Sequence, residues 1–524
     1  MTEDINAVEA RLPVQPPLDY PQEPIYHGAD APCRFEAEVY HCQVFGEIPK
    51  DLDGTYYRTM PDPVWNPGHP DDNYLNGDGV VGALRFFNGH VDFKQRFVRT
   101  RKFVIERAAR TNLFGKFRNR FTADPRVENE IRSTGNTHVI LWNKQLIALK
   151  EDSVPYALDP NTLDTIGVET FGGQLTSKTF NAHPKIDPVT GELINIGYEA
   201  KGDGTNDISY FVFDKNGKKT EECWFKAPFV CMTHDIGVTE NWIVVILPPL
   251  VYVPDELQKQ GHSHFAWDAT TPMTFGMFPR RSPKPEDIRW FTYEPAFGVH
   301  AGNAYENANG VVCLDMPIAN WNRMFYFPAL DEKRRGVPVD RSRYMRFHFD
   351  PKSTSTHVDG EVMVDIMGEF PTIDNRFATR SYRYTFLATS GAAKKGTMNN
   401  RPGNGIAMLD LETHTYTKWC AGEEATLTEA SFVPRNAQAP EGDGYLICII
   451  NRKDRLLTSA VILDCLKLQE GPVAIVNLPF RLRTSTHGSF ALASEIGERR
   501  ELCDMSHVTP DLLEKFGTDR VDRG

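Results

Sequence analysis

The chain repeats one local pattern: an apolar strand-like run, an aspartate, a tight turn and a second strand-like run. The clearest copies lie at residues 156–162, 184–191, 212–217, 408–413 and 462–465. The aspartate can accept hydrogen bonds from the turn backbone, and the flanks are β-branched or aromatic. Repeated hairpins at short intervals predict an all-β protein, and their spacing fits the four-stranded blades of a β-propeller. One or two β-sandwiches are the alternative. The copies are too irregular for the number of blades to be counted from the sequence.

Four histidines lie beside strand-like sequence in four separate segments. They are His183, His234, His300 and His487. No His-Glu-x-x-His motif is present, so one helix does not supply a metal site. A closed, radially repeated fold is the simplest way to bring the four together, and imidazoles suit zinc, copper, iron or nickel. Any single histidine is more often structural or exposed, and we interpret the other histidines, His138 and His264 among them, in that way.

A site of four neutral imidazoles leaves the charge of a divalent ion unbalanced. Carboxylates that accept a hydrogen bond from the free ring N–H of each ligand would balance it and fix the tautomer. Acids beside apolar strand-like sequence are the candidates, namely Glu151, Glu369 and Glu429. Each of them, taken singly, could equally be a solvated acid at a strand end.

Composition and charge limit the class of protein. The net charge of -12 argues against nucleic acid as a partner. The nine cysteines include no Cys-x-x-Cys pair, so we expect reduced thiols in a cytoplasmic protein. No apolar run approaches the ~20 residues of a transmembrane helix. Residues 1–20 are read as a loosely ordered extension that is neither signal peptide nor anchor. No Gly/Ser linker divides the chain, so residues 1–524 are expected to form one domain.

Helix is scarce in this sequence. The best candidate lies within residues 102–121, where Phe103, Leu113 and Phe117 alternate with basic residues such as Arg107 and Arg118. A basic amphipathic segment of this kind can contact a membrane surface. We favour a helical cap over one face of the β-body, with solvated arginines, and keep weak membrane-surface contact as the alternative.

Short segments along nearly the whole chain form a recognisable ordered set. They include Leu52-Asp53-Gly54-Thr55-Tyr56-Tyr57-Arg58, Asn76-Gly77-Asp78-Gly79, Ala182-His183-Pro184-Lys185, His300-Ala301-Gly302-Asn303, Phe370-Pro371-Thr372-Ile373-Asp374, Phe432-Val433-Pro434-Arg435 and His487-Gly488. In this order, and with all four histidines, the set resembles the carotenoid cleavage oxygenase family, and within it the fungal stilbene-cleaving enzymes.

The resemblance implies a seven-bladed β-propeller, a helical cap over its top face and one Fe(II) on the propeller axis. His183, His234, His300 and His487 match the family's iron ligands. Glu151, Glu369 and Glu429 match the glutamates that support those ligands. The implied reaction is a dioxygenase cleavage of an alkene C=C by O2 into two carbonyl products, without an added organic cofactor.

Lys150 and Phe117 bear on the substrate. In the stilbene-cleaving relatives, a lysine at the place of Lys150 contacts the substrate's 4-hydroxyl, and a tyrosine shares that contact where this chain has Phe117. The missing hydroxyl puts resveratrol in question and keeps isoeugenol and 4-vinylguaiacol as candidates. Lys150 could instead pair with Glu151. Adjacent side chains on a regular strand face opposite sides, so both serve one site only if the strand ends or bends there.

Two other functions compete with cleavage of a phenolic alkene. A carotenoid or apocarotenoid cleavage enzyme would be favoured by the basic segment, whereas the net acidity and Lys150 argue against it. A propeller that acts as a binding scaffold without metal would leave the four histidines unexplained.

Overall fold

The computed structural model describes residues 18–324, 327–330, 342–391 and 403–509, with residues 4, 5, 7, 11, 12, 14, 511, 512 and 515. The extension expected at residues 1–20 lies mostly outside the described residues.

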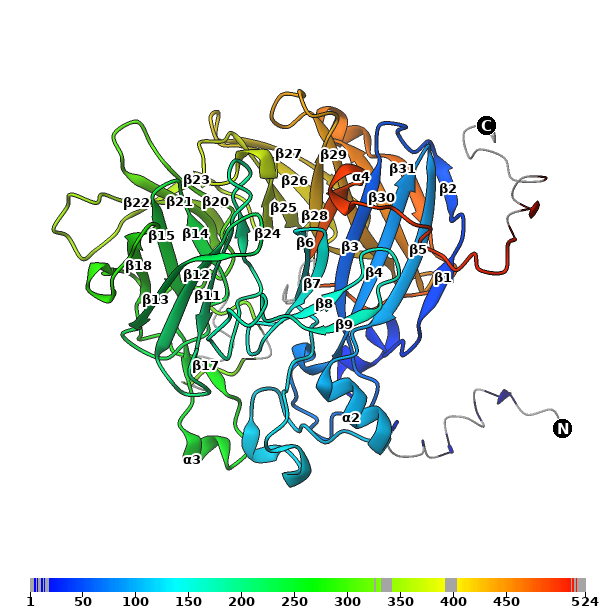
Figure 1. Cartoon of the computed structure of the whole chain (residues 1–524), viewed down its shortest axis with the longest axis horizontal. Helices are drawn as coiled ribbons and strands as arrows, with labels where there is room; N and C mark the ends of the chain where they lie inside the picture. Colours follow the sequence, from blue (N-terminus) through cyan, green and yellow to red (C-terminus); the bar gives the residue numbers. More distant parts are fainter. Residues whose placement is uncertain are drawn as a thin grey trace.

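Seven antiparallel sheets form the body of the protein (Figure 1). The first contains β1 (Ala37–Val39), β5 (His90–Phe97), β4 (Asp78–Phe87), β3 (Gly54–Asp62) and β32 (Gly488–Leu492). The second contains β6 (His138–Trp142), β7 (Gln145–Leu149), β8 (Tyr156–Leu158) and β9 (Thr165–Val168). The third contains β10 (Lys185–Ile186), β11 (Leu193–Tyr198), β12 (Asp207–Phe213) and β13 (Lys219–Lys226).

The remaining sheets follow in chain order. The fourth contains β14 (Ile236–Val238), β15 (Trp242–Leu247), β18 (Met273–Pro279) and β19 (Arg289–Tyr293). The fifth contains β20 (Asn303–Glu306), β21 (Val312–Ile318), β22 (Arg343–Phe349) and β23 (Gly360–Val364). The sixth contains β24 (Gly368–Ile373), β25 (Tyr384–Thr389), β26 (Gly405–Asp410) and β27 (Thr415–Cys420). The seventh contains β2 (Gln43–Gly46), β31 (Pro472–Asn477), β30 (Leu457–Asp464), β29 (Gly444–Arg452) and β28 (Ala425–Pro434).

The two ends of the chain close the ring of sheets. Near the C-terminus, β32 pairs with β3 in the first sheet, and near the N-terminus, β2 pairs with β31 in the seventh. The blue and orange strands therefore lie side by side in Figure 1. Inner strands of neighbouring sheets touch, as in β24–β28, β28–β32, β32–β6 and β14–β20. The expected all-β, seven-bladed propeller is confirmed.

The turn aspartates act as the sequence predicts. Asp159 Oδ1 accepts hydrogen bonds from the backbone N–H groups of Asn161 and Thr162, both at 2.8 Å. Equivalent bonds to an N–H two residues further on are made by Asp187, Asp214, Asp410 and Asp464. These bonds satisfy the backbone of tight turns, so hairpins form at short intervals.

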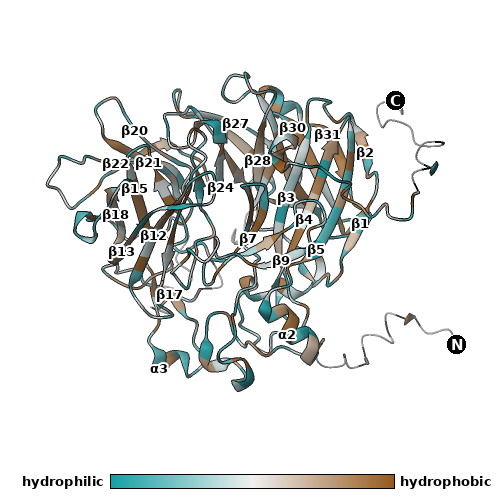
Figure 2. Ribbon diagram, in the orientation of Figure 1, coloured by the Kyte–Doolittle hydropathy of each residue, from teal (hydrophilic) through white to brown (hydrophobic). Residues whose placement is uncertain are grey.

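The core lies within and between the blades. Strands such as β11 and β12 are buried along their whole length, and Figure 2 shows apolar colour concentrated on the strands of the body. Polar colour predominates in the connecting loops. Hydrophobic burial between neighbouring blades therefore holds the ring together.

Helices are few, and α2 (Arg101–Ala109) and α3 (Asp255–Gln258) lie at one end of the body (Figure 1). The other named helices are α4 (Ala493–Ile496) and the 3-10 helices η1 (Pro24–Tyr26), η2 (Gly28–Asp30), η3 (Tyr74–Asn76), η4 (Arg120–Thr122), η5 (Pro125–Val127), η6 (Pro285–Asp287), η8 (Asn375–Phe377) and η9 (Cys465–Glu470). A two-stranded sheet joins β16 (Leu250–Tyr252) and β17 (Phe265–Trp267). We call α2, η4, η5 and α3, with the loops between them, the cap.

The helix expected within residues 102–121 is shorter than that segment. It begins after Thr100, whose Oγ1 accepts from Phe103 N, and it ends at Arg110, which has a positive φ of 57°. The expectation of solvated arginines is wrong for Arg118, which is buried. The Arg118 guanidinium donates to Glu199 and to Tyr198 Oη, and these partners balance its charge.

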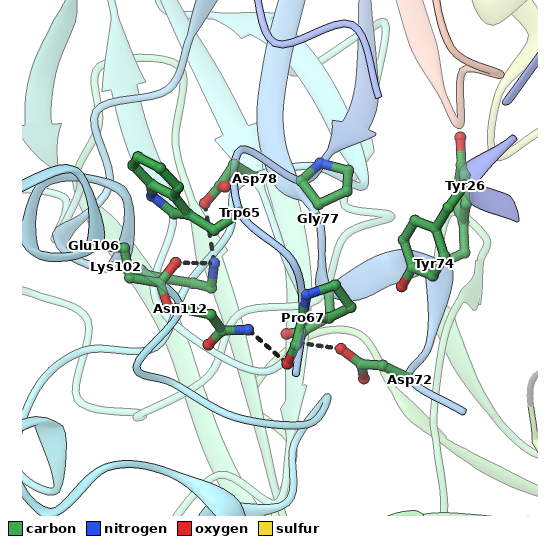
Figure 3. A pocket seen from close by; sticks show the side chains of 12 residues that line it. Tyr26, Trp65, Pro67, Asp72, Tyr74, Gly77, Asp78, Lys102, Glu106 and Asn112 are labelled. Carbon is green, nitrogen blue, oxygen red and sulfur yellow. Dashed lines mark hydrogen bonds and ion pairs between the residues drawn. The ribbon is translucent and has the colours of Figure 1, made fainter. Parts of the chain in front are cut away.

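A buried ion network anchors α2 to the propeller. Lys102 Nζ lies 3.0 Å from Asp78 Oδ1 and 2.7 Å from Glu106 Oε2, and Figure 3 shows the ammonium between the two carboxylates. Glu106 Oε1 also accepts from the backbone N–H groups of Leu113 and Phe114. Asp78 begins β4, so the network joins the cap to the first blade. Among the described residues, no helix has the length and apolarity needed to span a membrane.

Candidate metal centre

The four candidate ligand histidines lie at the start of four different inner strands. His183 precedes β10, His234 precedes β14, His300 precedes β20 and His487 precedes β32. Inner strands of a propeller surround one axis, so equivalent positions on different blades meet there. This arrangement explains how residues far apart in sequence reach one point.

The four imidazoles converge closely enough to share one ion. One nitrogen from each ring lies within 4.8 Å of the chosen nitrogens of the others, and all four residues are buried. The Nε2 atoms of His183 and His234 are 3.0 Å apart, and those of His234 and His300 are 3.1 Å apart. Two nitrogens at right angles, each about 2.1 Å from one ion, would be about 3.0 Å apart. The donor set therefore fits a divalent transition metal.

The protonation of two of these rings also suits a metal. Burial lowers the pKa of both His183 and His487, and repulsion from neighbouring imidazoles lowers it further. Both rings are therefore neutral at neutral pH, which is the form that binds a metal.

Three glutamates contact three of the candidate ligands. The Nδ1–H groups of His234, His300 and His487 face Glu151 Oε1 at 3.3 Å, Glu369 Oε2 at 2.6 Å and Glu429 Oε1 at 2.9 Å. Such bonds leave Nε2 as the donor atom toward a metal. His183 has no carboxylate partner among the described residues, and its backbone N–H donates to Asn181 Oδ1 at 2.8 Å.

Two of the glutamates lie at β-bulges. Strand β24 carries one extra residue relative to β25 between Glu369 and Thr372, and β28 does so relative to β29 between Leu427 and Ala430. A bulge locally turns a strand and can aim a side chain at a neighbouring site. The bulges therefore let an inner-strand carboxylate face a histidine of another blade.

Phe370 occupies the first of these bulges with a positive φ of 55°. A left-handed conformation in a residue other than glycine costs about 1–3 kcal/mol and persists where its surroundings fix it. The Phe370 ring lies 5.2 Å from the rings of His300 and His487, and its N–H donates to Glu369 Oε2 at 2.6 Å. The strained residue thus packs against two candidate ligands and holds the carboxylate that faces one of them.

Lys150 and Glu151 lie beyond the end of strand β7, so their side chains need not face opposite sides as neighbours on a regular strand do. Strand β7 ends at Leu149, and the turn that follows is closed by Ser153 N donating to Lys150 O at 3.2 Å. Burial opposes ionisation of Glu151, but the charges of Lys150 and His234 outweigh it and lower the pKa of this carboxyl. The end of the strand allows the two neighbouring side chains to serve one site.

The Lys150 ammonium has no hydrogen-bond partner among the described residues. The residue is only 1 % exposed, and its Nζ lies 4.7 Å from the centre of the Phe117 ring. The ion pair with Glu151 that the sequence allowed is not formed between the described atoms. A buried ammonium whose hydrogen-bond donors are unused is unfavourable, so this position is suited to a polar or anionic partner from outside the chain.

His138, which the sequence analysis interprets as structural or exposed, lies next to the site. Its ring centre is 5.3 Å from that of His183 and 5.5 Å from that of His487. The available signal was its position at the start of an inner strand, β6, which it shares with the ligand histidines.

The structure has a second group of side chains of the types that can bind a metal, and their contacts within the chain explain them without one. Glu199, Asp203 and His264 lie together, but Arg118 donates to Glu199, and His264 Nε2 lies 2.9 Å from Glu199 Oε1. We therefore assign this group to the anchoring of the cap, in agreement with the structural reading of His264.

Comparison with known proteins places this geometry in a family. The family model "Retinal pigment epithelial membrane protein" matches residues 30–492. Carotenoid cleavage oxygenase 1 of Neurospora crassa is 40% identical over 94% of this chain and 96% of its own length. The chain belongs to the carotenoid cleavage oxygenase family.

Other members of the family differ in the substrates that they are named for. Resveratrol cleavage oxygenase 1 of Aspergillus fumigatus is 39% identical over 92% of this chain and 98% of its own. Isoeugenol monooxygenase of Pseudomonas putida is 36% identical over 89% of this chain and 97% of its own length. The crystal structure of Pseudomonas brassicacearum lignostilbene dioxygenase superposes with a TM-score of 0.85, at 37% identity over 90% of this chain and 99% of that one. This family member is therefore an oxygenase with the propeller of its relatives.

Proposed function

We propose that this protein is an Fe(II)-dependent dioxygenase that cleaves the C=C bond of 4-hydroxyphenyl alkenes with O2 and releases an aromatic aldehyde. Hydroxystilbenes such as resveratrol and phenylpropenoids such as isoeugenol or 4-vinylguaiacol are the candidate substrates. The observation that carries the substrate class is Lys150, a buried ammonium without a hydrogen-bond partner. It directly precedes Glu151, which faces the candidate ligand His234. The relatives named for resveratrol, isoeugenol and lignostilbene support the same class.

His183, His234, His300 and His487 would hold the iron. Bound Fe(II) supplies the site at which O2 is activated. The chain's own residues do the rest: Glu151, Glu369 and Glu429 keep the Nδ1 protons on three rings and so direct Nε2 inward. The balance of the reaction is one alkene and one O2 giving two carbonyl compounds.

Lys150 would bind the substrate through its hydroxyl. The Nζ ammonium can donate a hydrogen bond to the phenol oxygen, and it stabilises the phenolate if the proton leaves. A phenolate releases electron density into the conjugated alkene and makes it more reactive toward an oxidant. Lys150 would thus orient the substrate and activate it from the end remote from the double bond.

Phe117 would leave that hydroxyl with one fewer hydrogen-bonding side chain than a tyrosine would. Its ring centre lies 4.7 Å from Lys150 Nζ, and the ring carries no hydroxyl. The backbone N–H of Phe117 donates to the buried Asp72 Oδ1 at 2.8 Å, which fixes the segment. Lys150 would therefore be the sole side chain of the pair to hydrogen-bond the phenol.

An apocarotenoid substrate is the second candidate. The Neurospora relative is named for carotenoid cleavage, and the described structure places basic and apolar residues together on the cap. A hydrocarbon chain, however, offers no partner to a buried ammonium.

We also propose a cytoplasmic location, since all nine cysteines are free thiols. Weak contact of the cap with membrane surfaces is proposed as well.

A cycle of enzyme and substrate changes tests the role of Lys150. Lys150→Ala and methylation of the substrate's 4-hydroxyl should each lower kcat/KM strongly, because either change leaves a polar partner unpaired. Together they should lower it little more than either does alone. Phe117→Tyr should restore a second contact and shift preference toward hydroxystilbenes. Additive losses in the cycle would reject the phenol contact and favour the apocarotenoid reading.

A further inference from the structure

His138 stands between two of the candidate ligands. It is the first residue of β6, the inner strand of the second blade, which supplies no ligand. The neighbouring blades supply His487, just before β32, and His183, just before β10. The His138 ring centre is about equally far from both, at 5.5 and 5.3 Å.

The hydrogen bonds of this segment reach the backbone of both ligands. His138 Nδ1–H donates to Ala182 O at 2.8 Å, one residue before His183. Thr137, the residue before His138, adds a second link, since His487 N donates to Thr137 O at 3.2 Å. The start of β6 therefore ties together two ligand-bearing segments from different blades.

His183 is the ligand that needs such support most. His234, His300 and His487 each face a glutamate, whereas His183 has no carboxylate partner among the described residues. We propose that His138 is a positioning residue of the metal centre, which fixes His183 through its bond to Ala182 O. The inference rests on the proposed function only in that the four imidazoles bind a metal.

Three substitutions separate this role from simple packing. His138→Asn places an amide N–H near the position of Nδ1 and can keep the bond to Ala182 O. His138→Gln carries its amide one bond further out and cannot reproduce that bond without displacement. His138→Leu fills the space without a donor.

Anaerobic titration of iron-free protein with Co(II), followed by the visible absorption of the bound ion, provides a readout apart from activity. Loss of groups that orient ligands typically weakens metal binding by about 10–100-fold. We expect a loss of this size for Leu and Gln, with an altered Co(II) spectrum, and near wild-type affinity for Asn. With iron, Leu and Gln should lower kcat while KM stays nearly unchanged.

Several results would overturn the inference. Wild-type affinity and spectrum in the Leu and Gln variants would do so, as would equal losses in all three variants. If the Leu variant does not fold, the contrast between Asn and Gln decides the matter. A wild-type protein that binds no Co(II) or Fe(II) would instead reject the proposed function, so the two failures are distinguishable.

Discussion

At the scale of single residues, His300 shows how a candidate ligand is held by contacts on more than one side. The Nδ1 atom of His300 faces Glu369, and its ring packs against Phe370. The residue lies in the connection between blades, just before β20. Pre-oriented imidazoles bind an ion with little reorganisation, because their rotamers are already fixed. The metal centre is therefore sensitive to the loss of either a ligand or its partner.

Removal of one ligand should abolish metal binding and turnover together. We expect His300→Ala to contain far less iron than wild type after anaerobic purification and to lose activity. Metal analysis by mass spectrometry, with thermal unfolding as a control for folding, measures this. A folded His300→Ala protein with full iron content and normal rate would exclude His300 from the site.

Loss of a supporting carboxylate should be milder. Glu369→Gln and Glu429→Gln keep the size of the side chain but remove the charge that fixes the ligand tautomer, so we expect losses of about 10–100-fold in iron affinity or turnover. The exposed Glu361→Gln serves as the matched control. If both buried variants equal the control, the support assigned to these glutamates is absent.

At the scale of elements, turns and inner strands place the site. The turn aspartates allow the hairpins to be predicted from the sequence. Each aspartate side chain accepts a hydrogen bond from a backbone N–H only two residues further on, so the interaction is local. The number of blades came from the family resemblance instead, since the closing pairs β3–β32 and β2–β31 join opposite ends of the chain.

Elements that depend on distant partners were the ones that sequence could not predict. The end of α2 at Arg110 carries no glycine signal, and Arg118 is buried because Glu199 meets it from the third blade. The unpartnered state of Lys150 and the bulges at Glu369 and Glu429 likewise depend on tertiary packing. The candidate ligands were predictable because their segments resemble a family pattern.

The cap should loosen when its buried ion network is broken. Lys102→Met leaves Asp78 and Glu106 as adjacent buried carboxylates, and loss of one partner of a buried ion pair costs about 3–5 kcal/mol. Amide hydrogen exchange across residues 101–121 should therefore be at least about 100-fold faster. Arg107→Met, on the exposed face of the same helix, should change little. Equal exchange in the two variants would contradict an anchoring role for Lys102.

At the scale of the whole molecule, the cap combines exposed apolar and basic side chains on a chain with a net charge of -12. Val104, Phe121 and Leu257 are 46%, 36% and 37% exposed. Lys259 Nζ lies 5.5 Å from the centre of the Phe121 ring, and an Arg120–Asp255 ion pair joins η4 to α3. Apolar side chains flanked by cations suit the interface of an anionic membrane.

Weak, salt-sensitive binding to anionic vesicles should follow. We expect partial co-sedimentation at low ionic strength, reduced by salt because the attraction is screened, and largely lost in a Phe121→Ser/Leu257→Ser double variant. Val362→Ser, which changes an exposed apolar residue of β23, is the matched control. Equal sedimentation of the double variant and the control would remove the cap from membrane contact.

The central claim is that one folded unit uses four imidazoles and Lys150 to cleave a phenolic alkene with O2. Product mass spectrometry after short reactions of iron-replete protein with a 4-hydroxystilbene and, separately, with isoeugenol under isotopically labelled O2 tests it most directly. The account predicts that at least one of the two alkenes is cleaved into two carbonyl products, each carrying one labelled oxygen. If both alkenes stay intact in the presence of bound iron, or if the products carry no label from O2, the claim is contradicted.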